Sequence, residues 1–150
     1  MKRKHLFAGA MIAALMLNAA PASAHSIFAR LQAERERNQV TVEQTGVNNG
    51  AAVAQTGQSN GALVTQQGAA NTGIVQQPGN ANTGGIRQVG VGNTATLTQE
   101  GNANNGCIVQ SGTGHNANVN QSGGQYTAFI QTDRGTRPIS GWLANRLCRR

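Results

Sequence analysis

Eight glutamines recur every eleven residues without an insertion or deletion between them, and each is followed two residues later by a glycine. The glutamines are Gln44, Gln55, Gln66, Gln77, Gln88, Gln99, Gln110 and Gln121. The glycines are Gly46, Gly57, Gly68, Gly79, Gly90, Gly101, Gly112 and Gly123. A period this strict indicates an internally repeated architecture, which constrains the fold more than any local propensity does.

Three further positions of the repeat are restricted in the same way. The seventh residue after each glutamine is Ala or Gly, and the ninth is Val, Ile or Leu, so that Ala128 and Ile130 take these positions in the last unit. The fifth residue is Asn in six units and then changes, in the order Asn49, Asn60, Asn71, Asn82, Asn93, Asn104, His115 and Tyr126. The unit is therefore Gln-x-Gly-x-x-Asn-x-(Ala/Gly)-x-aliphatic-x-Gln.

This pattern predicts one strand and one corner per unit. The Asn, small, aliphatic and Gln positions lie two residues apart, so they share one face of an extended strand. The step from Gln to the next Asn breaks this alternation and contains the fixed glycine, which can adopt the positive φ that a corner often requires. The sequence therefore predicts an all-β fold, a β-solenoid of 11-residue half-coils in which two units form a coil of 22 residues.

Stacked coils place identical residues above one another at the inter-strand spacing of about 4.8 Å. An inward column of Gln or Asn can satisfy itself, because each NH₂ meets the carbonyl of the next coil and no buried amide is left unpaired. The alternative is that the amides face water, but the aliphatic column would then face water too. We therefore expect the Gln and Asn columns to be internal stacking ladders and the fixed glycines to be turn residues.

The solenoid is expected to span residues 38–132, beginning with a degenerate unit and ending with the unit from Gln121 to Gln131. The pattern then fails, since Arg134 stands in the glycine position. Residues 133–150 form a basic C-terminal tail, whose last part has an apolar helical face. The tail is expected not to extend the stack, but either to cap its last coil or to dock the chain on an anionic surface or partner.

Residues 1–24 have the organisation of a secretory signal peptide. Basic residues at positions 2–4 precede an apolar run from Leu6 to Leu17, and a small-residue cleavage site ends at Ala24. The apolar run is shorter than the roughly 20 residues that cross a membrane, so cleavage is favoured over a retained anchor. Residues 25–37 then form a flexible N-terminal segment.

Charge lies almost entirely outside the repeats. Loss of the signal peptide lowers the formal net charge from +7 to +4, and only Arg87 and Glu100 are charged between Gln44 and Gln131. Nucleic-acid binding favours a basic face with interleaved aromatic residues, which is missing.

The acidic residues do not pair at repeat positions suited to acid–base catalysis, and no Cys–His spacing fits a metal. We therefore expect no enzyme activity, small-molecule substrate, cofactor or metal. His115 is expected to replace Asn in its ladder.

The two cysteines, Cys107 and Cys148, belong to a chain expected to enter an oxidising compartment. Cys107 lies at an outward position of its strand and Cys148 lies in the tail. Three states are compatible with the residues: a disulfide that ties the tail to the sheet, a bond between molecules, and two free thiols.

Two functions fit a nearly uncharged solenoid. One is a structural subunit whose strands continue from chain to chain, because open sheet edges pair and Gln/Asn ladders favour cross-β assembly. The other is a monomeric binding solenoid, such as an ice-binding protein, which would present flat outward threonine arrays. Thr94, Thr96 and Thr98 align on one strand, but the strands two units away do not repeat them. The fibre subunit is therefore favoured.

The unit from Gln44 to Gln55, Gln-Thr-Gly-Val-Asn-Asn-Gly-Ala-Ala-Val-Ala-Gln, resembles the curlin repeat of bacterial curli fibres, and eight copies cover residues 44–131. The resemblance implies a subunit that the curli secretion pore exports across the outer membrane. It then polymerises, with itself and other curlin subunits, into extracellular amyloid for adhesion and biofilm. Gln44, Asn49 and their counterparts would be the stacking ladders. Curlins often begin with a Gly-rich secretion segment, which residues 25–37 do not form, and an Arg-rich tail is more like the minor, nucleating subunit.

Overall fold

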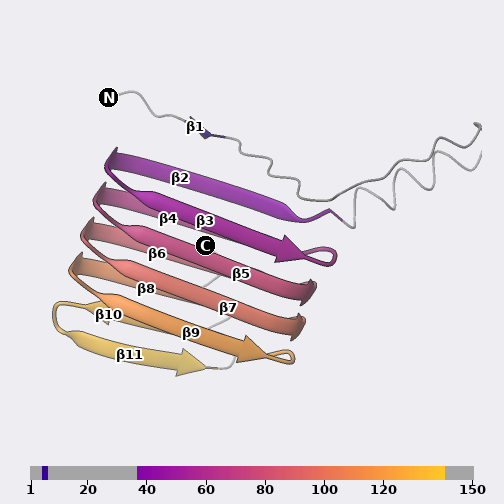
Figure 1. Ribbon diagram of the computed structural model, residues 1–150. Coiled ribbons are helices and arrows are strands. Elements are labelled where there is room, and N and C mark those ends of the chain that lie inside the picture. The colour runs from indigo at the N-terminus through magenta and orange to yellow at the C-terminus, as the bar shows by residue number, and fades with distance from the viewer. Residues whose placement is uncertain (1–4, 7–36, 141–150) are drawn as a thin grey trace, which may run out of the picture.

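The computed structural model describes residues 5–6 and 37–140, which form eleven strands and no helix (Figure 1). Most of the predicted signal peptide, residues 25–36 of the N-terminal segment, and the predicted helical face and Cys148 of the tail lie outside the described residues. The 22-residue coils stack into a β-solenoid of about four turns, which confirms the predicted fold class.

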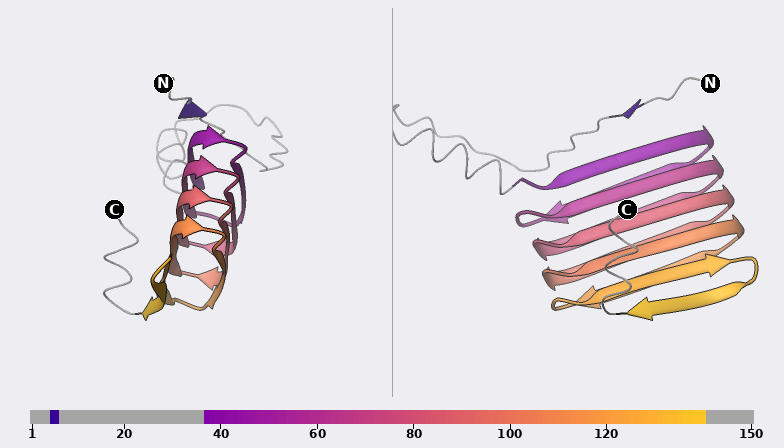
Figure 2. Two further views of the ribbon diagram at one scale, coloured as in Figure 1. Left: turned by 90° about the vertical axis from the view of Figure 1, so that its left-hand side faces the viewer. Right: turned by 180° about the vertical axis from the view of Figure 1, so that it is seen from behind.

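The strands form two sheets. The first contains, in spatial order, β1 (His5–Leu6), β2 (Gln39–Val47), β4 (Gly61–Ala69), β6 (Thr83–Val91), β8 (Asn105–Thr113), β10 (Tyr126–Thr132) and β11 (Gly135–Ser140). The second contains β3 (Gly50–Thr56), β5 (Thr72–Asn80), β7 (Thr94–Asn102) and β9 (Asn116–Ser122). The chain alternates between the sheets, which face each other as two layers (Figure 2).

Neighbouring repeat strands within a sheet are parallel and aligned by repeat position. Gln44 lies opposite Gln66, which lies opposite Gln88, and the same register holds in the second sheet, where Gln55 lies opposite Gln77. Parallel pairing at this offset brings equivalent residues of successive coils together. Every column read from the sequence is therefore a physical column along the stack as far as β9.

The core lies between the two sheets and consists of the aliphatic column. Val64, Ile86 and Ile108 of the first sheet pack with Val75 and Leu97 of the second, and all are buried. The small column leaves room for the glutamines of the opposite sheet. A Cβ on Gly84, for example, would lie 2.9 Å from Gln99 Oε1 and 3.0 Å from Gln77 Nε2.

Each corner contains the fixed glycine. Gly68 and Gly90 have φ of +122° and +126°, and a Cβ on either would overlap the carbonyl oxygen of the equivalent glycine one coil further on. Two constraints therefore exclude other residues there: the left-handed backbone and the close approach of the next coil. A second left-handed residue, two positions after the glycine, was not predicted, and Ala70, Ala81 and Ala103 occupy it at φ of +55° to +58°.

The last unit is shifted by one residue from the predicted register. Phe129, not Ile130, lies opposite Ile108, and Ala128 lies opposite Cys107 on the outward face. The assignment of Tyr126 to the Asn position was also wrong, because it is the backbone N–H of Gln125 that donates to Asn104 Oδ1. The cause is Gln131, which follows Gln121 by ten residues and aligns with Gln110.

The region after residue 132 differs from its prediction as well. Residues 135–140 form β11, which pairs antiparallel with β10, placing Ile139 opposite Ala128. The predicted boundary at residue 132 therefore separates two strands of a hairpin, and part of the predicted tail extends the first sheet. The short β1 pairs antiparallel with Val42 and Glu43 at the other end of that sheet.

We predict that Gly68→Ala and Gly90→Ala each lower the free energy of unfolding by about 1–3 kcal/mol, because the methyl group meets a backbone carbonyl at a strained φ. Gly61→Ala is the matched control, since no atom lies within 4 Å of the Cβ it would add and its φ is not left-handed. Circular dichroism against denaturant concentration measures the loss of β-structure. Equal midpoints for Gly68→Ala and Gly61→Ala would contradict the prediction.

Candidate functional site: the glutamine and asparagine columns

The inward glutamines form two hydrogen-bonded columns along the stack, one in each sheet. In the first sheet Gln44 Nε2 donates to Gln66 Oε1 (2.6 Å), and the chain of bonds continues to Gln110, whose Nε2 donates to Gln131 Oε1 (2.8 Å). The second sheet repeats this from Gln55 to Gln121, with N–O distances of 2.7–2.8 Å. The glutamines are buried from Gln66 onward through Gln121, so each amide replaces water with an identical amide.

Each glutamine also connects the two sheets. The second proton of Gln66 Nε2 goes to the carbonyl of Gly50 (2.8 Å), which begins the preceding strand in the opposite sheet, and Gln88 Nε2 reaches the carbonyl of Thr72 in the same way (2.9 Å). This bond recurs from Gln55 to Gln131, and repeat spacing alone did not indicate it. A backbone carbonyl can accept a hydrogen bond from the NH₂ group of the amide but not from its oxygen. The bond between the sheets therefore also determines the orientation of each glutamine amide.

The asparagine columns lie at the corners and bond mainly to the backbone. Asn71 Nδ2 donates to the carbonyl of Gly90 (2.9 Å), and Asn71 Oδ1 accepts the backbone N–H of Asn93 (3.2 Å). Direct amide–amide bonds also occur, as from Asn93 Nδ2 to Asn71 Oδ1 (3.0 Å). The predicted ladder is therefore a mixed one, in which the Asn side chain satisfies the corner backbone of the next coil. Asn49, Asn60 and Asn82 also donate to the glycine carbonyl of the next coil, whereas Asn104 Nδ2 donates to Asn82 Oδ1 and to the carbonyl of Glu100.

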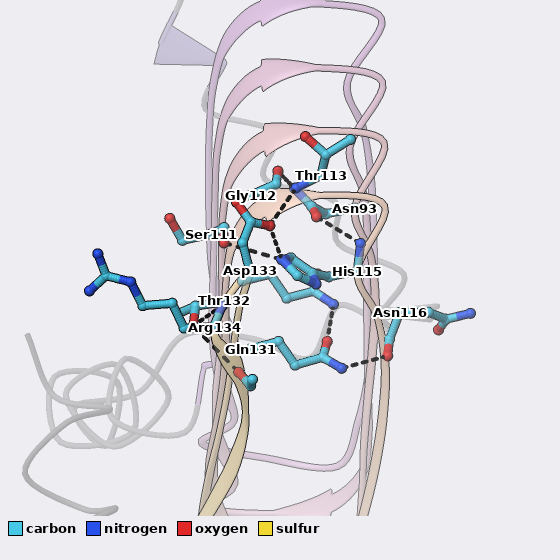
Figure 3. A network of polar contacts seen from close by, with 12 residues as sticks. Asn93, Ser111, Gly112, Thr113, His115, Asn116, Gln131, Thr132, Asp133 and Arg134 are labelled. Atoms are coloured by element: carbon cyan, nitrogen blue, oxygen red, sulfur yellow. Dashed lines mark hydrogen bonds and ion pairs between the residues drawn. The ribbon is translucent and has the colours of Figure 1, made fainter.

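His115 and Asp133 end one of these corner columns (Figure 3). The backbone N–H of His115 donates to Asn93 Oδ1 (3.0 Å), as an asparagine there would. Its Nε2 lies 3.2 Å from the carbonyl of Ser111 and 3.1 Å from Asp133 Oδ1.

Asp133 stands one register step below Gly112, and its carboxylate occupies the place of the glycine carbonyl in the next coil. The same Oδ1 accepts the backbone N–H of Thr113 (3.3 Å). The His–Asp pair therefore imitates the Asn–glycine carbonyl contact where the repeat stops. His115 is only 17% exposed and Asp133 is 71% exposed.

Cys107 is buried although its position faces outward, because Ala128 and Ile139 cover it. The structure contains Cys107 in a disulfide bond. Cys148 is the only other cysteine of the chain but lies outside the described residues. The pairing of these two cysteines remains a prediction.

The outward threonines do not form an array. On the second sheet Thr94, Thr96 and Thr98 of β7 lie opposite Asn116, Asn118 and Asn120 of β9, and opposite Thr72, Ile74 and Gln76 of β5. This register is the one expected from the sequence. The second sheet therefore lacks the regular outward threonine array that an ice-binding surface would need.

No group of three or more His, Cys, Asp or Glu side chains capable of holding a metal ion occurs among the described residues. Over the same part of the chain, no helix is long and apolar enough to cross a membrane.

Comparison with known proteins identifies the repeat. A family model described as the curlin associated repeat matches residues 36–68, 68–101 and 90–123, which together span more than half of the chain. These ranges cover the strands that carry the columns from β2 to β9. No curated protein matches the chain.

We predict that Gln77→Leu lowers the free energy of unfolding by several kcal/mol. The substitution leaves the Nε2 of Gln55, the Oε1 of Gln99 and the carbonyl of Gly61 without their partner, and each unsatisfied buried group costs about 1–3 kcal/mol. The neighbouring Gln76→Leu makes the same chemical change on the exposed face and is expected to change stability by less than about 0.5 kcal/mol. Denaturant unfolding of both variants measures the difference in the free energy of unfolding. Similar losses for Gln77→Leu and Gln76→Leu would show that the buried amide column does not stabilise the fold.

Proposed function

Because the chain belongs to the curlin repeat family, we propose that it is a structural subunit of extracellular curli-type amyloid fibres, assembled by stacking at its sheet edges. The observation that carries this proposal is the pair of glutamine columns, buried in the middle of the stack and ending at exposed or half-buried residues, Gln44 and Gln55. A column that can be extended by an identical column favours cross-β assembly.

The chemistry of the described residues supports a structural role. The curlin repeat family is structural and non-enzymatic, and the buried amides of the glutamine columns between residues 37 and 140 are taken up by bonds to one another and to the backbone. The proposed partners are copies of this chain and other curlin subunits, reached after export through the outer membrane by the curli secretion pore. The fibres then serve surface adhesion and biofilm.

A finer assignment within the fibre is the minor, nucleating subunit. Arg134 and Arg137 follow the last repeat, and Arg146, Arg149 and Arg150 complete a basic C-terminal region. Such a region favours an anionic surface or partner over another uncharged repeat. Nucleation by this chain would appear as a shorter lag before another curlin subunit polymerises, and an unchanged lag would exclude the role.

The purified mature chain should form fibres with cross-β reflections at about 4.8 Å and about 10 Å. The triple variant Gln55→Leu, Gln77→Leu and Gln99→Leu removes three of the four glutamines of the second-sheet column. It should form fibres more slowly, because the remaining ladder partners stay unsatisfied. A triple variant at the outward neighbours, Ala54→Leu, Gln76→Leu and Thr98→Leu, is the control. A stable soluble monomer that inhibits ice growth would contradict the fibre function. An unchanged rate of fibre growth for the glutamine variant would show that the glutamine columns do not contribute to assembly.

Export is expected to remove residues 1–24, since the cleavage site follows a basic region and a short apolar run. N-terminal sequencing of extracellular material should therefore begin at His25. The uncleaved chain recovered from the inner membrane would contradict this.

A further inference from the structure

The first coil is only partly covered in a single chain. We call its outer surface, formed by β2 and β3, the N-terminal edge. Gln44 is exposed, and Gln55, Val42 and Val53 are half-buried, whereas their counterparts one coil further on are buried. Strand β1 covers only Val42 and Glu43 of this edge, and it lies in the segment whose removal is proposed above.

The glutamine columns are polar, and both run in the same direction. Every Nε2 donates toward the C-terminal end of the stack and every Oε1 faces the N-terminal end. The N-terminal edge therefore presents the acceptor oxygens of Gln44 and Gln55. The opposite surface, formed by β9 and β10 and here called the C-terminal edge, presents the NH₂ groups of Gln121 and Gln131. The second proton of Gln121 Nε2 donates to the carbonyl of Gln125 in the single chain (3.3 Å), a bond that a further coil would have to replace. These two edges are complementary to each other, and neither is complementary to itself.

The number of strands determines how two copies would stack. The repeat strands number five in the first sheet, from β2 to β10, and four in the second. If a second copy lay directly below the first, one strand position in the second sheet would stay empty. A rotation by half a turn about the stack axis removes this gap, because β2 of the second copy then continues β9 and its β3 continues β10. The strands stay parallel, since successive strands run in opposite directions in the two layers (Figure 1).

Strand β11 occupies one half of the C-terminal edge. It pairs antiparallel with β10 from Thr127 to Thr132, where β3 of a second copy would have to pair in parallel. Its own outer side is a poor template, because Pro138 has no N–H to donate and Arg137 adds a charge that discourages edge pairing. The packing of Ile139 against Cys107 and Ala128 holds β11 in this place.

Resting on the proposed fibre function, we propose that the N-terminal edge binds the C-terminal edge of a second copy of this chain, rotated by half a turn, and that β11 must leave β10 before this contact forms. The acceptors Gln44 and Gln55 of one copy then meet the donors Gln121 and Gln131 of the other, which continues both columns across the junction. In this arrangement β11 is a removable cap that limits the rate of growth.

The cap is tested in the full-length mature chain with Ile139→Asp, which removes the apolar contact that holds β11. The control is Leu63→Asp, which makes the same aliphatic-to-acid change at an exposed outward position of β4, away from β11. Fibre elongation on preformed seeds should be severalfold faster for Ile139→Asp than for the wild type, and unchanged for Leu63→Asp. Hydrogen exchange should show loss of protection in β11 with protection kept from β4 to β8.

Equal elongation rates in all three proteins would overturn the proposal that β11 is a cap. Slower growth of Ile139→Asp, with hydrogen-exchange protection kept in the solenoid strands, would overturn it too. If Ile139→Asp loses protection throughout, the double variant Thr136→Pro and Arg137→Pro takes its place. Adjacent N–H groups of a strand alternate in direction, so one of the two faces β10 and is removed. Absence of cross-β fibres in every variant, wild type included, would overturn the proposed function itself.

The half-turn is tested with like charges at the junction, in the Ile139→Asp background. Asn118 lies three residues before Gln121, so in the rotated stack it lies opposite Thr41. In an unrotated stack β2 of the second copy continues β10, so that Thr45 lies opposite Thr132. Asn118, Thr41 and Thr45 are exposed and Thr132 is half-buried, and like charges directly opposite each other destabilise strand pairing. Asn118→Glu with Thr41→Glu should slow elongation severalfold beyond the two single changes, whereas Thr132→Glu with Thr45→Glu should not. The reverse result would overturn the rotation.

Discussion

The buried glutamine amide is the group on which the rest of this structure depends. Gln88 accepts a hydrogen bond from Gln66, donates one to Gln110 and donates a second to the carbonyl of Thr72. An unpaired buried amide costs far more free energy than a typical hydrogen bond contributes. Each glutamine is therefore tolerated only because the coils on both sides place a glutamine in the same position, and this mutual requirement explains a period without insertions.

The other columns follow from the glutamines. A side chain that crosses to the opposite sheet needs room there, and Gly73 and Gly84 provide it, since a Cβ on either would approach two glutamine amides. Coils close enough for amides to bond also bring their corners into contact. Gly68 and Gly90 are then required, because any Cβ would meet the carbonyl of the next corner, and the asparagines satisfy those carbonyls. The small, glycine and asparagine columns are consequences of one hydrogen-bonding distance along the stack.

The fold class and the inward columns could be predicted from the sequence because they are periodic in side-chain type. The one-residue shift at β10 could not be read from the core, since Ala128 and Ile130 have the residue types that the small and aliphatic columns require. The distinguishing residue was Gln131, whose amide can continue the column only if Phe129 takes the aliphatic position.

The second left-handed corner position was not predictable for another reason. Its occupants include Asn48, Ser59, Ala70 and Gly92, which share no side-chain chemistry, and only the backbone reveals what they have in common. Strand β11 was missed because pairing across a hairpin depends on contacts with Cys107 and Ala128 that carry no periodic signal.

In a repeat whose polar groups bond to the neighbouring coils, the first and last coils each lack one neighbour. The two ends of this chain differ in how they satisfy these groups. At the C-terminal end the Asn–glycine carbonyl contact is replaced by His115 and Asp133, and the chain then reverses into β11, so the last corner is satisfied within the molecule. At the N-terminal end Gln44 and Gln55 continue their columns only inward, and no comparable substitute is present among residues 37–140. Because the amide columns are polar, the end that lacks a substitute can be completed only by donors, and a C-terminal edge of the same repeat is a source of donors at the correct spacing. The same hydrogen bonds that hold one chain together therefore give its assembly a direction.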